Sequence, residues 1–232
     1  MLFSSTARIQ ERRALVREMV LPALGILLGL LGPAYLTLAL TPDTVVLALY
    51  GTKWVGVIPI IVPLALGMPF FGAHALLGPI LCGLGRPELE FWPQAISCGA
   101  ATVAYFIAAG SSATSVAWAL FGVMILRFLL IAIFLFRLLK ISWLKALVLL
   151  SRIGSFSLAF GGAMWGLDRL LQLLHCGPLA RVSVMLLVAI GLLGCGIYFA
   201  ADLVFGRDAV RFLVVYGARL PDKFIRQLQK RV

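Results

Sequence analysis

Long apolar stretches separated by short connections occupy most of this chain of 232 residues, and they restrict its fold more than any motif does. Hydrophobic residues make up 62% of the chain, and charged residues make up only 12%. A soluble domain of this length has too small an interior to bury that much apolar surface. The sequence therefore predicts a polytopic membrane protein.

The apolar stretches are long enough to cross a bilayer as helices. A hydrocarbon core of about 30 Å requires about 20 residues of α-helix, and backbone amides in lipid must be paired within the segment. We predict an all-α bundle of six transmembrane helices at 20–206, with a cytoplasmic amphipathic segment at 1–19 and a basic amphipathic tail at 207–232. The predicted spans are Val20–Leu40, Val55–Gly83, Phe91–Ala109, Val116–Leu139, Ala146–Leu167 and Val182–Phe205.

The distribution of basic residues predicts the orientation of the spans, because Lys and Arg accumulate in cytoplasmic loops. Sixteen of the 20 Lys and Arg residues lie in the N-terminal segment, around the connections after the second and fourth spans, or in the tail. All these parts share one side, so both termini are expected in the cytoplasm. Topology explains the net charge of +11 without a nucleic-acid partner. We expect the tail to contact membrane lipid, with a soluble partner as the alternative.

The second predicted span is rich in proline. Its prolines are Pro59, Pro63, Pro69 and Pro79. Interior prolines kink or break a helix, and transporters use broken helices to move between states. We therefore predict a kinked or broken, mobile span with hinges at Pro59, Pro63 and Pro69; the alternative is that proline is simply common in membrane helices. Gly-x-x-x-Gly pairs at Gly25–Gly29 and Gly162–Gly166 predict close helix packing.

Charged and titratable residues inside the predicted spans are the candidate site. Arg127 lies in the middle of the fourth span, where arginine costs at least about 2.5–3.5 kcal/mol, and none of the nine acidic residues is an evident partner. Because a guanidinium matches phosphate, we predict that Arg127 contacts a ligand anion, with a structural role as the alternative. Arg152 is a second substrate-binding candidate, although it can also reach the inner interface. His74 is a gating or proton-relay candidate, with a structural hydrogen bond as the alternative.

The sequence shows no recognisable catalytic or metal-binding set. It contains no His/Asp/Ser group, no paired carboxylates on one helix face and no phosphate-binding glycine loop. The four cysteines form no Cys-x-x-Cys pair. We therefore expect no enzyme activity, no cofactor, no metal site and no disulfide.

Three short motifs resemble those of one known family. The motifs are Ser4-Ser5 with Arg8-Ile9-Gln10 before Leu21-Pro22, then Leu49-Tyr50-Gly51-Thr52-Lys53-Trp54, and Leu84-Gly85-Arg86-Pro87. They are similar to a cytoplasmic loop, an outer Gly-x-Lys-Trp turn and an inner Leu-Gly-Arg turn of bacterial polysaccharide-export flippases. These flippases belong to the multidrug/oligosaccharidyl-lipid/polysaccharide exporter superfamily. Full-length members have two pseudo-symmetric helix bundles, and this chain resembles only the C-terminal one.

The resemblance implies a function in polysaccharide or lipopolysaccharide biosynthesis. It implies that the chain translocates a polyprenyl-pyrophosphate-linked oligosaccharide across the bacterial inner membrane, as a partial flippase. Such a partial flippase would act as a homo-oligomer or together with a missing N-terminal half. Two alternatives remain open. One is a non-transporting scaffold that docks glycan-assembly enzymes; the other is a drug or cation exporter of the same superfamily, against which the scarcity of carboxylates in the spans argues.

Overall fold

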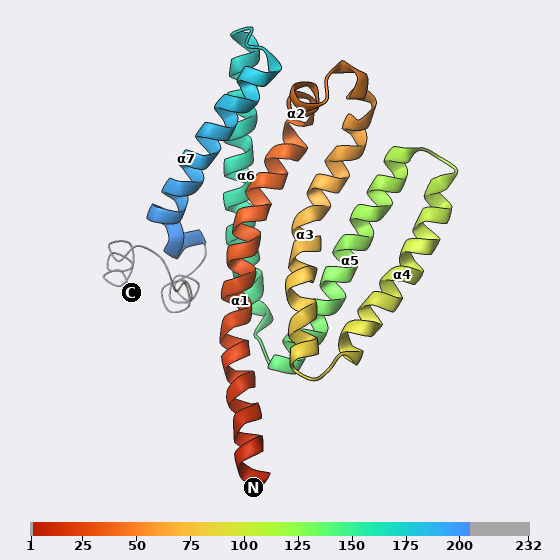
Figure 1. Cartoon of the computed structure of the whole chain (residues 1–232), viewed down its shortest axis with the longest axis vertical. Coiled ribbons are helices and arrows are strands. Elements are labelled where there is room, and N and C mark those ends of the chain that lie inside the picture. Colours follow the sequence, from red (N-terminus) through yellow and green to blue (C-terminus); the bar gives the residue numbers. More distant parts are fainter. Residues whose placement is uncertain (1, 205–232) are drawn as a thin grey trace.

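The computed structural model describes the backbone of residues 2–204 and the side chains of residues 13–108 and 110–191. Every regular element in this part of the chain is helical, so the predicted all-α fold is confirmed (Figure 1). The predicted tail at 207–232 lies outside the described residues. The elements are α1 (Leu2–Leu40), α2 (Pro42–Leu49), the 3-10 helix η1 (Thr52–Val57), α3 (Ile58–Gly83), α4 (Glu88–Ala109), α5 (Ala113–Leu139), α6 (Trp143–Leu173) and α7 (Pro178–Val204).

A long helix occupies the position of each predicted span. Four helical stretches, which lie in α1, η1–α3, α5 and α6, are long and apolar enough to cross a membrane. Helix α4 begins with the acidic residues Glu88 and Glu90, and the side chains of α7 are described only as far as Gly191. The structure thus supports a membrane protein. That α4 and α7 also cross, as six spans require, stays a prediction.

The long helices lie side by side in one row, in the order α4, α5, α3, α1, α6 and α7 (Figure 1). Each helix packs on its neighbours in that row, and the short helix α2 contacts α7 and α3 at one end. Within residues 2–204, the outermost helices α4 and α7 share no substantial interface. The predicted bundle is therefore open in the described part of the chain, and α1 joins two groups of helices.

Glycines of α3 allow its neighbours to approach closely. An added Cβ at Gly67 would collide with Met124 of α5, and one at Gly72 would lie 2.5 Å from Cδ1 of Leu31 in α1. A third glycine, Gly78, faces α4. Because lipid gives helices no hydrophobic drive to associate, such close van der Waals contacts hold membrane helices together.

The packing of α6 differs from the prediction. Gly25 and Gly29 of α1 are buried, but Gly162 and Gly166 of α6 are exposed, with nothing within 4 Å of an added Cβ. Gly161 contacts α1 instead, where an added Cβ would lie 3.1 Å from Cγ of Leu36. The predicted contact of the Gly162–Gly166 pair is therefore wrong in the described structure, because that pair lies on the face of α6 that points away from α1.

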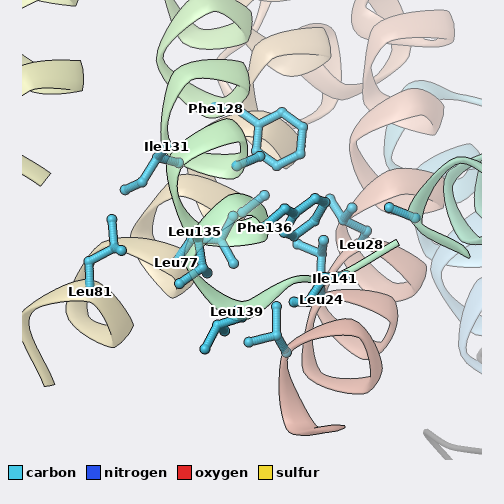
Figure 2. Close-up of a cluster of buried hydrophobic side chains, with 14 of the residues drawn as sticks. Leu24, Leu28, Leu77, Leu81, Phe128, Ile131, Leu135, Phe136, Leu139 and Ile141 are labelled. Atoms are coloured by element: carbon cyan, nitrogen blue, oxygen red, sulfur yellow. The ribbon is translucent and has the colours of Figure 1, made fainter. Parts of the chain in front are cut away.

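The largest apolar core lies where α1, α3 and α5 meet (Figure 2). Leu77 of α3 and Ile131 and Leu135 of α5 have no exposed surface, and Leu24 of α1 packs on the same cluster. These residues fix the spacing and rotation of three neighbouring helices. Polar residues that lie beside this core are thereby held in defined positions.

The prolines of α3 do not break the helix, so of the predicted kink or break, the break is wrong. Pro59 lies in the first turn, where its missing N–H leaves no intrahelical bond unmade. Pro63, Pro69 and Pro79 lie inside a helix that continues from Ile58 to Gly83. Neighbouring helices commonly keep such helices intact in membrane proteins. The chain direction changes earlier, at η1.

The basic connections lie together on one side of the molecule, at the same ends of neighbouring helices. The N-terminal part of α1, the α3–α4 connection and the α5–α6 connection share this end (Figure 1), and they carry Arg13, Arg17, Arg86 and Lys140. The sequence predicts that these basic residues lie on one side of the bundle, and the structure agrees. That this end faces the cytoplasm stays a prediction.

Candidate functional site

A polar cluster lies between α3, α4 and α5, beside the apolar core. It consists of His74 from α3, Glu90 and Gln94 from α4, and Arg127 from α5. We call these four residues the Arg127 cluster. Nη2 of Arg127 donates a hydrogen bond to Oε1 of Gln94. A neighbouring helix thus supplies the polar contact that the apolar residues of α5 cannot provide.

Glu90 of the Arg127 cluster lies against α3. Its Oε2 accepts a hydrogen bond from Sγ of Cys82 over 2.7 Å. Its Oε1 lies over Gly78, where an added Cβ would approach it to 2.6 Å. Because Glu90 and Gln94 are one helical turn apart, they share a face of α4. That face is turned toward α3 and α5.

The charges of the Arg127 cluster are close together without being paired. Glu90 lies one turn before Gln94, the hydrogen-bond partner of Arg127, and its carboxylate lies over Gly78, one turn after His74. However, no carboxylate of the described residues forms an ion pair with Arg127. Nδ1 of His74 and Nε of Arg127 are buried and have no hydrogen-bond partner among these residues. An unpaired buried polar group costs about 1–3 kcal/mol, so these two atoms make the cluster less stable than a fully bonded one.

This arrangement is suited to binding an anion. A guanidinium presents five N–H donors in a planar fork that matches phosphate or carboxylate oxygens. Among the described residues, one donor of Arg127 is bonded, and the acceptor is a neutral amide. Apolar core residues such as Phe128 and Ile131 lie beside the cluster, which strengthens attraction between the guanidinium and an incoming anion. In the part of the chain that the structure describes, no three metal-binding side chains come together.

The structure brings together only some of the predicted site residues. Arg127 and His74 belong to one cluster, whereas Arg152 lies exposed on α6. Helices α3 and α1 separate α5 from α6 in the row, so Arg127 and Arg152 do not form a single anion site. The hinge candidates Pro59, Pro63 and Pro69 precede His74 along α3. No observation tests their movement, and their role stays a prediction.

Sequence reasoning missed the contribution of α4. Glu90 and Gln94 stand at the start of a predicted span, where polar residues ordinarily meet the membrane interface. Their spacing of one helical turn was a usable signal, because it places both side chains on one face. Among the described residues, Arg127 forms no ion pair with a carboxylate and donates a hydrogen bond to Gln94. The partner is an uncharged side chain.

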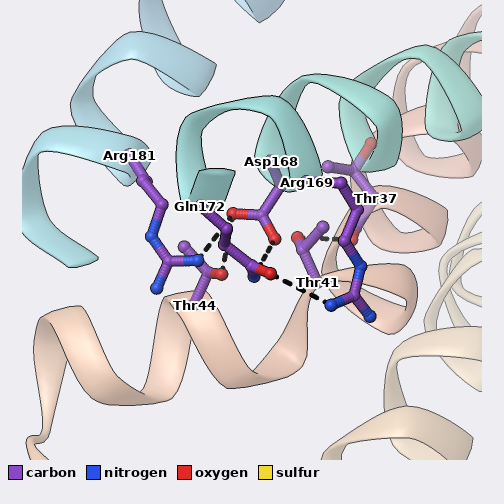
Figure 3. A network of polar contacts seen from close by, with 7 residues as sticks. All are labelled: Thr37, Thr41, Thr44, Asp168, Arg169, Gln172 and Arg181. Carbon is purple, nitrogen blue, oxygen red and sulfur yellow. Dashed lines mark hydrogen bonds and ion pairs between the residues drawn. The ribbon is translucent and has the colours of Figure 1, made fainter. Parts of the chain in front are cut away.

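A second polar network joins α2, α6 and α7 (Figure 3). It lies at the ends of the helices that are opposite the basic connections. Asp168 of α6 accepts hydrogen bonds from Thr44 of α2 over 2.8 Å and from Gln172 over 3.0 Å. Nη1 of Arg181 in α7 lies 3.3 Å from Oδ1 of Asp168, and this ion pair is buried. Arg169 extends the network by donating to Gln172 over 3.0 Å. We call this the Asp168 network, and it ties α7 to α2 and α6.

No protein-family model, no curated protein and no solved structure matches the chain. The resemblance to polysaccharide-export flippases therefore stays a prediction from short motifs. Two of these motifs contain a glycine with a left-handed backbone, Gly51 at φ 79° and Gly85 at φ 73°. Because this conformation favours glycine in any fold, the turn geometry alone accounts for both glycines.

Proposed function

We propose that this protein binds a polyprenyl-pyrophosphate-linked oligosaccharide and translocates it across the bacterial inner membrane during polysaccharide biosynthesis. The observation that carries the proposal is Arg127, a cation in the middle of an apolar helix whose hydrogen-bond partner in the described part of the chain is a neutral amide. Charged side chains within membrane segments are costly and usually serve an ion or substrate path. A pyrophosphate headgroup offers the opposite charge and the acceptor oxygens that Arg127 lacks.

The position of the Arg127 cluster supports access from the side. Gln94 is exposed on α4, the outermost helix of the row, and Arg127 is partly exposed behind it. A lipid-linked substrate has a headgroup that needs polar partners and an apolar chain that is stable in the bilayer. In this proposal the headgroup contacts the cluster while the polyprenyl chain stays among the lipid tails.

Helix α3 is the element that moves in this proposal. Pro63 and Pro69 each remove a donor of the backbone ladder in the half of α3 that precedes His74. A helix bends most readily where such a bond is missing. Bending of α3 would change its distance from α4 and α5, and thus open or close the Arg127 cluster.

The proposal is tested by deleting the gene in its native bacterium and measuring surface polysaccharide together with lipid-linked oligosaccharide retained on the inner leaflet. We expect the deletion to reduce export and to cause retention, and the wild-type gene to reverse both. Arg127→Ala should lower export roughly tenfold or more at normal protein level, because a bond to a charged group is lost. Arg137→Ala removes the same charge from the exposed end of α5 and serves as the control.

Two results would contradict the proposal. One is unchanged export after deletion of the gene. The other is wild-type export by Arg127→Ala. A large loss of protein with Arg127→Ala would show instead that this arginine serves the fold.

A further inference from the structure

Two glutamates near the start of α4 have different surroundings. Glu88 is exposed and forms an ion pair with Arg86 over 3.1 Å, outside the Arg127 cluster. Glu90, two residues after Glu88, is half-buried and turned toward α3. It is the one carboxylate within the described residues that lies in the Arg127 cluster. An acid at the start of a helix is ordinarily exposed, as Glu88 is. The half-buried position of Glu90 therefore needs another explanation.

The structure holds the Glu90 carboxylate in place without pairing it with the cation. Cys82 donates to one oxygen, and the missing side chain of Gly78 leaves room for the other. Arg127 bonds to Gln94, which lies one turn further along α4. A negative charge is thus fixed close to a guanidinium whose Nε is still free among the described residues.

We infer that Glu90 is a specificity-determining counter-charge, which opposes the phosphate of a bound headgroup at Arg127 and promotes its release. This inference rests on the proposed function. In apolar surroundings a carboxylate and a phosphate repel each other strongly, and the repulsion grows with the charge of the headgroup. A transport site must release its ligand as well as bind it. Before a ligand arrives, the same carboxylate offsets part of the charge of Arg127.

The test uses the purified full-length protein in detergent and two probes, geranylgeranyl pyrophosphate and geranylgeranyl monophosphate. Glu90→Gln keeps the shape of the side chain and an acceptor for Cys82 but removes the charge. We expect it to tighten binding of the pyrophosphate by about fivefold or more, and of the monophosphate by less. Glu88→Gln removes a charge from the same end of α4 and should leave both affinities unchanged.

A second variant separates competition at Arg127 from a general change of charge. In an Arg127→Ala background, Glu90→Gln should no longer produce the difference between the two probes, because the guanidinium over which the anions compete is absent. Inorganic pyrophosphate should compete only weakly with the prenyl probe. Equal competition would identify a free anion as the ligand and would overturn the lipid assignment.

The outcomes for the inference and for the proposed function are distinguishable. If Arg127→Ala weakens binding but Glu90→Gln leaves it unchanged or weaker, the role of Glu90 is overturned and the proposed function stands. If Arg127→Ala binds the pyrophosphate probe as the wild type does, the proposed function fails. Glu90→Ala should repeat the effect of Glu90→Gln. Loss of folded protein in both variants would overturn the inference, because a structural role would then account for Glu90.

Discussion

The Arg127 cluster and the Asp168 network contain similar residue types but satisfy them differently. Asp168 accepts three hydrogen bonds, one of which comes from a buried arginine of opposite charge. Arg127 donates one described hydrogen bond, to a neutral amide. Arg181 also has an unpartnered Nε, but its charge is matched directly by Asp168. The comparison indicates that the Asp168 network stabilises the fold, whereas the Arg127 cluster has charge and donors left for a ligand.

Accessibility separates the two regions as well. Asp168 is 3% exposed and Arg181 is 8% exposed, so neither is available to a ligand. In the Arg127 cluster, Gln94 is exposed and Arg127 is partly exposed. A site that binds and releases a lipid headgroup needs exposed polar side chains of this kind.

Asp168→Asn should produce the largest loss of stability. It would leave the buried Arg181 without a counter-charge, which costs about 3–5 kcal/mol when one partner of a buried pair is removed. Thermal unfolding of the purified protein in detergent measures the effect. Asp43→Asn, a change at an exposed acid of α2, is the control and should have little effect. A small loss with Asp168→Asn would contradict the structural role of the network.

Gly78→Ala should have the next largest effect. The new methyl group would lie 2.6 Å from Oε1 of Glu90, so the flexible carboxylate must move and its hydrogen bond from Cys82 is lost. Loss of such a bond costs about 0.5–1.5 kcal/mol. Gly83→Ala, on the same helix with no atom within 4 Å, is the matched control. Equal unfolding temperatures for the two variants would show that Glu90 does not lie against α3.

His74→Leu should separate stability from function. Its buried Nδ1 has no partner among the described residues, so an apolar residue removes an unsatisfied group worth about 1–3 kcal/mol. We expect unchanged or higher stability together with reduced export. Export and thermal unfolding should be measured on the same preparations. Lower stability with normal export would assign His74 to the fold.

Glu88→Gln should have the smallest effect. A hydrogen bond from its own backbone N–H and the Arg86 side chain lower the pKa of Glu88. The carboxylate is therefore charged at neutral pH, and its contribution is lost only as the pH falls through this lowered pKa. Because the pair is exposed, the variant should unfold like the wild type at neutral pH. A clear destabilisation would show that the contrast between Glu88 and Glu90 is wrong.

The helices could be predicted from the sequence because each apolar run has the length of a bilayer span and ends at polar, glycine or proline residues. The row of helices could not be predicted. Gly161 and Gly162 are adjacent and chemically identical, yet only Gly161 faces α1. Which glycine makes the contact depends on the rotation of α6, and that rotation is set by the whole interface.

Only part of the candidate site could be predicted from the sequence, because the rest depends on how the helices pack. Arg127 is conspicuous because a charge inside an apolar helix is costly. Gln94 is not, because a neutral amide near a helix start carries no such cost. Its role follows only from the packing of α4 on α5, which places the amide at the guanidinium. The Asp168 network likewise depends on α2, α6 and α7 meeting at one end.

The different roles of the Arg127 cluster and the Asp168 network are decided by export per folded molecule in Arg127→Ala and Asp168→Asn, compared with the wild type. Folded protein is quantified by size-exclusion chromatography, and export is measured in the deletion strain. The account predicts that Arg127→Ala yields normal amounts of folded protein and loses roughly tenfold or more of its export per molecule. It predicts that Asp168→Asn yields little folded protein. Normal export per molecule by Arg127→Ala, whatever its yield, would contradict the account.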